Sequence, residues 1–247
     1  MNHCTTTTTP LVVAIVLLAA SHANAALLNI DVNAANLAPS PTQAGYYSLD
    51  VTDSSGTSIS KTFTGVDTLV APGGSVTLGI SASTLFVTRD RASTPGDNPP
   101  FTLSNLYRDW MGSSGGPLAI TLQGLAANSR YDVSFYSYDD ANASNPVSNT
   151  DTFTNTTSGA SSPSGSITYG LAGGGTVSAN DQYKTTLSAI SDSFGSLSFD
   201  ESSVGPQGGP VLNGLEIVAV PEPAAALFGL VGIAGILRHR RGRMQSQ

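Results

Sequence analysis

The stretch SRYDVSFYSYD, residues 129–139, alternates between apolar and more polar side chains along most of its length. Tyr131, Val133 and Phe135 occupy every second position, and Asp132 and Ser134 lie between them. A period of two is typical of a β-strand, because successive side chains point to opposite faces of a sheet. The stretch therefore predicts a strand with one face in a hydrophobic core.

The same alternation recurs upstream in SVTLGIS (residues 75–81) and LAITLQGL (residues 118–125). Clusters of Gly, Pro, Ser, Thr and Asn separate these runs from other short apolar runs, as turns separate strands. Many short strands between turns favour an all-β fold, an antiparallel β-sandwich or jelly roll. The other predicted strands cover residues 27–33, 46–51, 85–88, 150–155, 166–169, 183–189, 196–200 and 215–218.

One segment departs from this pattern. In TLSNLYRDW, residues 102–110, apolar side chains recur at i, i+3, i+4 and i+7 from Leu103 to Trp110. This spacing places them on one face of a helix, so we expect one short amphipathic helix here. Trp110 would then lie either in the core or against a ligand.

The N-terminal residues predict export. Residues 11–20, LVVAIVLLAA, form a short apolar core, and small residues in A-x-A order follow as far as Ala25. This layout is typical of a secretory signal peptide, here residues 1–25, with cleavage after Ala25. The single cysteine, Cys4, would leave with it, so the expected ectodomain, residues 26–219, has no disulfide. That domain carries six basic and sixteen acidic side chains, which argues against nucleic acid as a partner.

The C-terminal residues predict a membrane anchor. Residues 221–237 are largely apolar, and the basic tail at residues 238–247 follows them. We therefore expect a single transmembrane helix at about residues 221–237, whose tail stays cytoplasmic under the positive-inside rule. A buried core helix is the alternative. Four arginines of this tail form the basic stop, which would halt transfer of the chain across the membrane: Arg238, Arg240, Arg241 and Arg243.

The triplet Pro221-Glu222-Pro223, the apolar segment and the arginines together resemble the PEP-CTERM sorting signal, also described as an ice-binding protein C-terminal domain. The resemblance covers residues 220–247. It implies a Gram-negative-type envelope, a transient stay in the inner membrane, and an exosortase-type enzyme as the processing partner. It also implies a final place at the cell surface or in the extracellular matrix.

The order of LLNIDVN, NLYRDWM, PLAITLQGLAANSRYDVSFYSYD and VLNGLEIVAV resembles the galactose-binding-like or malectin-like β-sandwich. Such domains are often attached to bacterial carbohydrate-active proteins, so the resemblance implies contact with polysaccharide. Its motifs specify strands and turns and contain no site residues. Asn213-Gly214 within the last motif is equally consistent with a hairpin turn.

Catalytic signals are weak in this sequence. Residues 26–219 contain no His and no Cys, which excludes Ser-His-Asp and Cys-His nucleophiles and His/Cys zinc sites. The G-x-S-x-G match at residues 112–116 precedes a predicted strand and is interpreted as a turn. Paired carboxylates leave a glycosidase or lyase as an alternative, with Glu201 and Glu216 the only glutamates of the domain.

Two sets of residues are candidates for binding. Asp139, Asp140 and Asn142 offer oxygen ligands in one loop, so calcium is the one cofactor considered. Tyr136 and Tyr138 would lie on the polar face of their strand and, with Trp110, could contact a sugar.

Together these features predict an exported, surface-sorted, non-enzymatic protein of the envelope or matrix that contacts polysaccharide. A structural or adhesive coat protein without a small-ligand site is the alternative from another class. Ice binding is the least favoured reading, because residues 152–156 give only one T-x-T-x-T run.

Overall fold

The computed structural model describes residues 26–35, 40–52, 56–66, 74–91, 96–139, 148–159, 161–170, 177–205 and 209–220. Ala26–Val220 forms one compact unit. Its described residues form strands and turns, and no helix occurs among them. The strands are β1 (Ala26–Ala34), β2 (Tyr47–Val51), β3 (Ser58–Thr64), β4 (Ser75–Ala82), β5 (Phe86–Asp90), β6 (Asp109–Ser113), β7 (Leu118–Gln123), β8 (Arg130–Tyr136), β9 (Asn149–Asn155), β10 (Ser164–Tyr169), β11 (Lys184–Ile190), β12 (Leu197–Val204), β13 (Val211–Leu212) and β14 (Gly214–Ala219).

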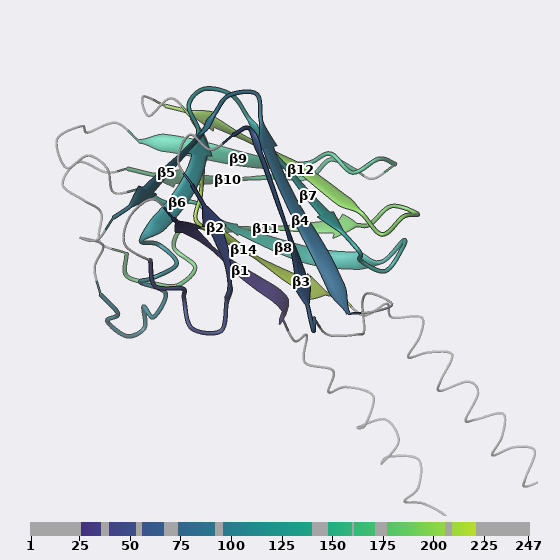
Figure 1. Cartoon of the computed structure of the whole chain (residues 1–247), viewed down its shortest axis with the longest axis horizontal. Coiled ribbons are helices and arrows are strands. Elements are labelled where there is room, and N and C mark those ends of the chain that lie inside the picture. Colours follow the sequence, from purple (N-terminus) through teal and green to yellow (C-terminus); the bar gives the residue numbers. More distant parts are fainter. Residues whose placement is uncertain are drawn as a thin grey trace, which may run out of the picture. The chain divides into compact units, whose positions relative to one another are not determined.

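These strands form a β-sandwich with a small additional sheet (Figure 1). The first sheet has the order β11-β8-β14-β1-β2, and the second has the order β10-β9-β12-β7-β4-β3. The third sheet has the order β13-β6-β5. Neighbouring strands are antiparallel except β1 and β2, which are parallel. The predicted all-β sandwich is therefore confirmed.

The core lies between the first and second sheets. Tyr131, Val133 and Phe135 of β8 are at most 1% exposed, as their alternation predicts. Phe135 stacks on Phe153 of β9 with ring centroids 4.4 Å apart, and it meets Phe199 of β12 edge-on at 5.1 Å. These contacts join the two sheets through aromatic side chains.

The predicted short helix at residues 102–110 is wrong. The segment contains only isolated turn bonds, such as the one from the Tyr107 amide to the Leu103 carbonyl (3.2 Å), and Asp109 begins β6. Every residue of β6 is buried, β5 and β13 pair with its two edges, and β1 packs against it. A strand buried throughout shows no alternation, so its pairing with distant strands outweighs the local helical spacing.

Asn213 is the point at which the chain passes from the third sheet to the first. β13 ends before it and β14 begins after it, so the hairpin interpretation of Asn213-Gly214 is wrong. Its amide donates to the Tyr136 carbonyl and its carbonyl accepts from the Val32 amide, both at 2.9 Å. This residue therefore belongs to the hydrogen-bonding pattern of the first sheet.

Both exits of the compact unit lie at one end of the sandwich, which we call the terminal end. Ala26 pairs with Val218, and the Val220 amide donates to the Arg130 carbonyl at 2.9 Å. The connections β7–β8, β9–β10 and β11–β12 lie at this end, as their strand registers show. β13 meets β14 at the opposite, distal end.

Candidate functional site

The aromatic residues predicted to contact a ligand are buried. Tyr136 and Tyr138 are each 2% exposed, and Trp110 is 8% exposed. Tyr107 covers both tyrosines edge-on, with centroid distances of 5.8 Å to each ring. The expected outward position of Tyr136 and Tyr138 is therefore wrong, because a distant segment covers that face of the strand.

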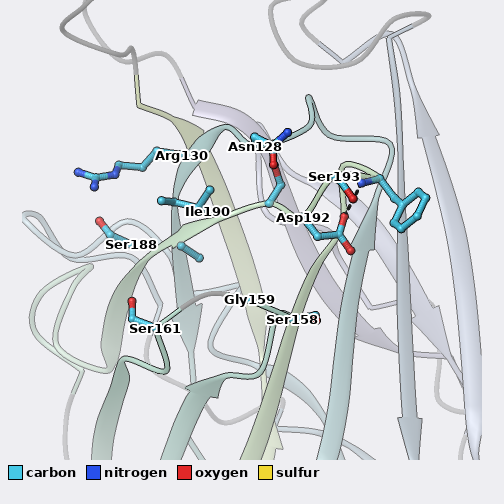
Figure 2. A pocket seen from close by; sticks show the side chains of 12 residues that line it. Asn128, Arg130, Ser158, Gly159, Ser161, Ser188, Ile190, Asp192 and Ser193 are labelled. Carbon is cyan, nitrogen blue, oxygen red and sulfur yellow. Dashed lines mark hydrogen bonds between the residues drawn. The ribbon is translucent and has the colours of Figure 1, made fainter.

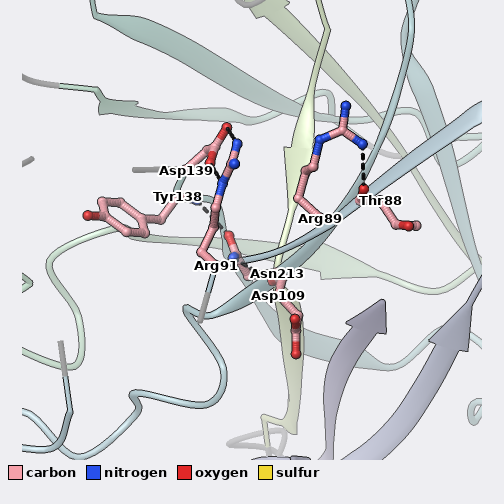
Figure 3. A network of polar contacts seen from close by, with 7 residues as sticks. All are labelled: Thr88, Arg89, Arg91, Asp109, Tyr138, Asp139 and Asn213. Atoms are coloured by element: carbon pink, nitrogen blue, oxygen red, sulfur yellow. Dashed lines mark hydrogen bonds and ion pairs between the residues drawn. The ribbon is translucent and has the colours of Figure 1, made fainter. Parts of the chain in front are cut away.

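Asp139 is held by an ion pair. Arg91 donates from Nε to Asp139 Oδ1 at 2.8 Å and from a terminal nitrogen to Oδ2 at 3.2 Å, as Figure 3 shows. A bidentate arginine neutralises this carboxylate without a metal ion. Asp140 and Asn142 lie outside the described residues, so a calcium ion at this loop stays a prediction.

The outer face of the first sheet carries a half-buried polar cluster. Glu216 accepts a hydrogen bond from the Tyr46 hydroxyl and forms an ion pair with Lys184 Nζ at 2.7 Å. Burial alone would raise the pKa of Glu216, but Lys184 and Tyr46 lower it overall. This glutamate is therefore a stable carboxylate and is poorly suited to donate a proton.

A second carboxylate cluster is closed to solvent. Asp151 and Glu201 are both 0% exposed and face the core from β9 and β12. Asp151 accepts from Ser137 Oγ at 2.5 Å and from the Tyr169 hydroxyl at 3.0 Å. Burial raises the pKa of Glu201 well above its usual value, and the nearby Asp151 adds to the effect. Both carboxyl groups are therefore shielded from solvent in this structure.

An open cleft of about 460 Å³ lies at the terminal end. It is bounded by residues of the β7–β8, β9–β10 and β11–β12 connections and by the end of β11. Figure 2 shows Arg130, Ser188 and Ser161 on one side of it and Asp192 and Ser193 on the other. The complete lining is Asn128, Arg130, Ser158, Gly159, Ser161, Ser188, Ala189, Ile190, Ser191, Asp192, Ser193 and Phe194.

Phe194 is the most exposed large apolar side chain among the described residues, at 87%. The turn that presents it is well fixed. Asp192 Oδ1 accepts from the amides of Phe194 (2.8 Å) and Ser196 (2.9 Å). The Leu125 amide donates to the Gly195 carbonyl at 3.0 Å, and a Cβ on Gly195 would meet the Leu125 carbonyl at 2.0 Å. The backbone of this turn is therefore fixed, and it places the Phe194 ring in solvent.

The polar lining of the cleft is mostly uncharged. Exposed serines and Asn128 provide hydroxyl and amide groups, and Arg130 forms no ion pair with any described residue. Asp192 already accepts two backbone hydrogen bonds, so it is a structural carboxylate. The cleft thus offers one aromatic face, one guanidinium and several neutral hydrogen-bonding groups.

Sequence reasoning missed this site. Phe194 lies within SDSFGS, residues 191–196, where turn-forming residues surround one aromatic side chain. That pattern identifies a turn but does not tell whether the ring faces the core or the solvent.

The sorting features lie outside the described residues. These are Ala25, Pro221, Glu222, Pro223 and the arginines at 238, 240, 241 and 243. Within the described ranges, no helix is long and apolar enough to span a membrane. The same ranges contain no group of three or more His, Cys, Asp or Glu residues suited to a metal ion.

No protein-family model and no curated protein matches the chain. Among solved structures, it is similar to TmCBM61 in complex with β-1,4-galactotriose, at 10% identity and a TM-score of 0.32. That match covers 59% of this chain and 88% of the other. A second similarity is to the CBM22-1-GH10 modules of the Clostridium thermocellum N-terminal endo-1,4-β-D-xylanase 10B, complexed with xylohexaose. Its identity is 11% and its TM-score 0.23, and it covers 67% of this chain and 26% of the other. Neither similarity assigns a ligand to this chain.

Proposed function

We propose that this chain is an exported, non-enzymatic protein of the cell envelope or extracellular matrix, and that its terminal-end cleft contacts polysaccharide. The observation that carries the proposal is Phe194, an aromatic ring 87% exposed on a turn fixed by Asp192 and Gly195. Exposing such a ring to water is unfavourable, and a bound partner that covers it regains that free energy.

The chemistry of the cleft suits a sugar. The axial C–H groups of a pyranose ring present an apolar face that can stack on an aromatic ring, while its hydroxyls need donors and acceptors around them. Asn128, Arg130 and the serines at 158, 161 and 188 provide those groups. A few polar groups around an apolar contact are typical of sites that orient a small ligand or one unit of a chain.

Export and processing form the second half of the proposal. They are supported by the apolar core at residues 11–20, by the Pro221-Glu222-Pro223 triplet and by the basic tail. The exosortase-type enzyme would act on the tail after the domain has crossed the inner membrane.

The test is affinity electrophoresis of the full chain in detergent through gels containing neutral or acidic polysaccharides. We expect retardation by at least one polysaccharide, and Phe194→Ala should weaken it about tenfold, equivalent to about 1.4 kcal/mol. Val204→Ala is the matched control, because Val204 is 78% exposed at the other end of β12. Equal mobility in every gel would favour a coat protein without a ligand site, and equal retardation of the two variants would exclude the cleft.

A further inference from the structure

Residues 40–43, β1 and β6 enclose a set of buried side-chain oxygens that lack a hydrogen-bond partner. The set comprises five atoms: Asp31 Oδ1, Asn33 Oδ1, Ser40 Oγ and both carboxylate oxygens of Asp109. Asp31 and Asp109 are 0% exposed, and Asn33 is 2% exposed. Buried polar atoms almost always have a partner, so five such atoms on four residues call for an explanation.

The backbone arrangement brings these residues together. Asp31 and Asn33 lie two apart on β1 and share a face of that strand. The segment that begins at Ser40 lies over this face, since the Gln43 amide donates to Asp31 Oδ2 at 2.6 Å. Asn33 Nδ2 donates to Thr42 Oγ1 at 2.9 Å. Strand β6, which begins with Asp109, packs against β1.

Electrostatic interactions also indicate that the side chains of Asp31, Asp109 and Ser40 lie close together. The Asp31 and Asp109 carboxyl groups are close enough to interact electrostatically. The Ser40 hydroxyl also lies near the Asp109 carboxylate. In Figure 3 the Asp109 carboxylate points away from Arg89 and Arg91. Two buried carboxylates therefore lie within interaction range of each other, and neither forms an ion pair with a described residue.

A cation satisfies this arrangement better than protons do. A protonated carboxyl and the Ser40 hydroxyl each offer a single donor, which leaves other acceptors of the set without one. The orientation of the Asn33 amide is fixed, because its nitrogen also donates to Asp50 Oδ1 at 3.4 Å and a carboxylate oxygen cannot donate. The Asn33 oxygen therefore belongs to the set without partners. A mixture of carboxylate, amide and hydroxyl oxygens is the ligand chemistry of Ca²⁺, whereas Mg²⁺ retains most of its waters.

We propose that Asp31, Asn33, Ser40 and Asp109 bind one Ca²⁺ ion, which clamps the segment at residues 40–43 onto β1 and β6. The ion needs six to eight oxygens, so backbone carbonyls or water complete its shell. This site is separate from the cleft that contains Phe194, which lies at the terminal end of the sandwich, and it does not depend on polysaccharide binding.

The first test is thermal unfolding of the full chain in detergent, with Ca²⁺ or with EGTA. Calcium at a hundred times its dissociation constant should raise the melting temperature by about 5 °C or more. Asp109→Asn preserves the shape of the side chain and removes a buried charge. In EGTA it should therefore melt at or above the wild-type temperature, and calcium should no longer raise it. Asp200→Asn, on an exposed residue of β12, should behave as the wild type.

The second test is terbium luminescence, in which Tb³⁺ substitutes for calcium and Trp110 is the donor of excitation energy. Trp110 is the only tryptophan of the chain and directly follows Asp109. Excitation of Trp110 should sensitise Tb³⁺ in the wild type and in Asp140→Asn, and excess Ca²⁺ should abolish the signal. The signal should be lost in Asp109→Asn. Melting curves unaffected by calcium, or a luminescence signal retained by Asp109→Asn, would overturn the proposal.

Discussion

At the scale of single residues, Glu201 and Glu216 have opposite environments. Glu201 is fully buried near Asp151, and neither of its carboxylate oxygens has a donor. Glu216 is partly exposed and is paired with Lys184. The pKa of Glu201 is therefore raised by burial, whereas that of Glu216 is lowered by its partners. The two residues should contribute to stability with opposite dependence on pH.

Glu201→Gln should make the protein less sensitive to alkaline pH. Above about pH 4.5 the unfolded chain loses the Glu201 proton while the folded chain keeps it, so wild-type stability falls as pH rises toward the raised pKa. Glutamine cannot ionise, so the variant should lose less stability between pH 5 and pH 8 and be the more stable protein at pH 8. Urea unfolding in EGTA at the two pH values measures this.

Glu216→Gln is the matched control, since it removes the other glutamate of the domain. Its lowered pKa means that the ionised form stabilises the fold at neutral pH, so this variant should be less stable than the wild type at pH 8. If both variants changed stability in the same direction at pH 8, the assignment of a protonated Glu201 would be wrong.

Single side chains also show how far sequence patterns can predict the position of a residue. Val133 and Phe135 were correctly placed in the core, because alternation within one strand is a local property. Tyr136 follows the same alternation and was predicted outward, but Tyr107 covers it from another segment. Phe194 was missed for the same kind of reason. Whether a face or a turn is covered depends on residues distant in sequence, which local patterns do not record.

At the scale of elements, Asn213 joins the third sheet to the first through its side chain. Its Oδ1 accepts from the Tyr138 amide at 2.6 Å, and its Nδ2 donates to the Asp109 carbonyl at 2.7 Å. The residue is 0% exposed, so water is excluded from both bonds. Sequence patterns predicted β14, but β13 is only two residues long, and its pairing with β6 is not a local feature.

Asn213→Ala should destabilise the protein by about 2–4 kcal/mol, because it leaves two buried backbone groups unpaired. Thermal or urea unfolding of the full chain measures the change. Asn29→Ala is a suitable control, since Asn29 makes one long bond of 3.5 Å to the Gly45 carbonyl and should change stability by less than about 0.5 kcal/mol. Equal effects of the two substitutions would mean that the Asn213 side chain does not hold the sheets together.

At the scale of the whole molecule, the described strands, core and cleft all lie within the compact unit Ala26–Val220. The last described hydrogen bond of the chain runs from the Val220 amide to the Arg130 carbonyl, and β14 ends at Ala219. A cut beyond Val220 would therefore remove none of the described strands, core side chains or cleft residues. Such an arrangement is compatible with processing after folding.

Replacing Pro221-Glu222-Pro223 with three alanines should block processing and leave the protein uncleaved in the inner membrane. An anchor needs only apolar length and a basic stop, and neither requirement specifies this triplet. Prolines disfavour a regular helix, so we expect the triplet to keep the backbone accessible to an enzyme, whereas alanines would favour helix and preserve the expected span. Mass spectrometry of wild-type protein from the cell surface or medium should find a C-terminus near Pro223. An intact LFGLVGIAGILRHRR sequence in that protein would mean that the tail serves only as an anchor, because the membrane segment would then have survived release.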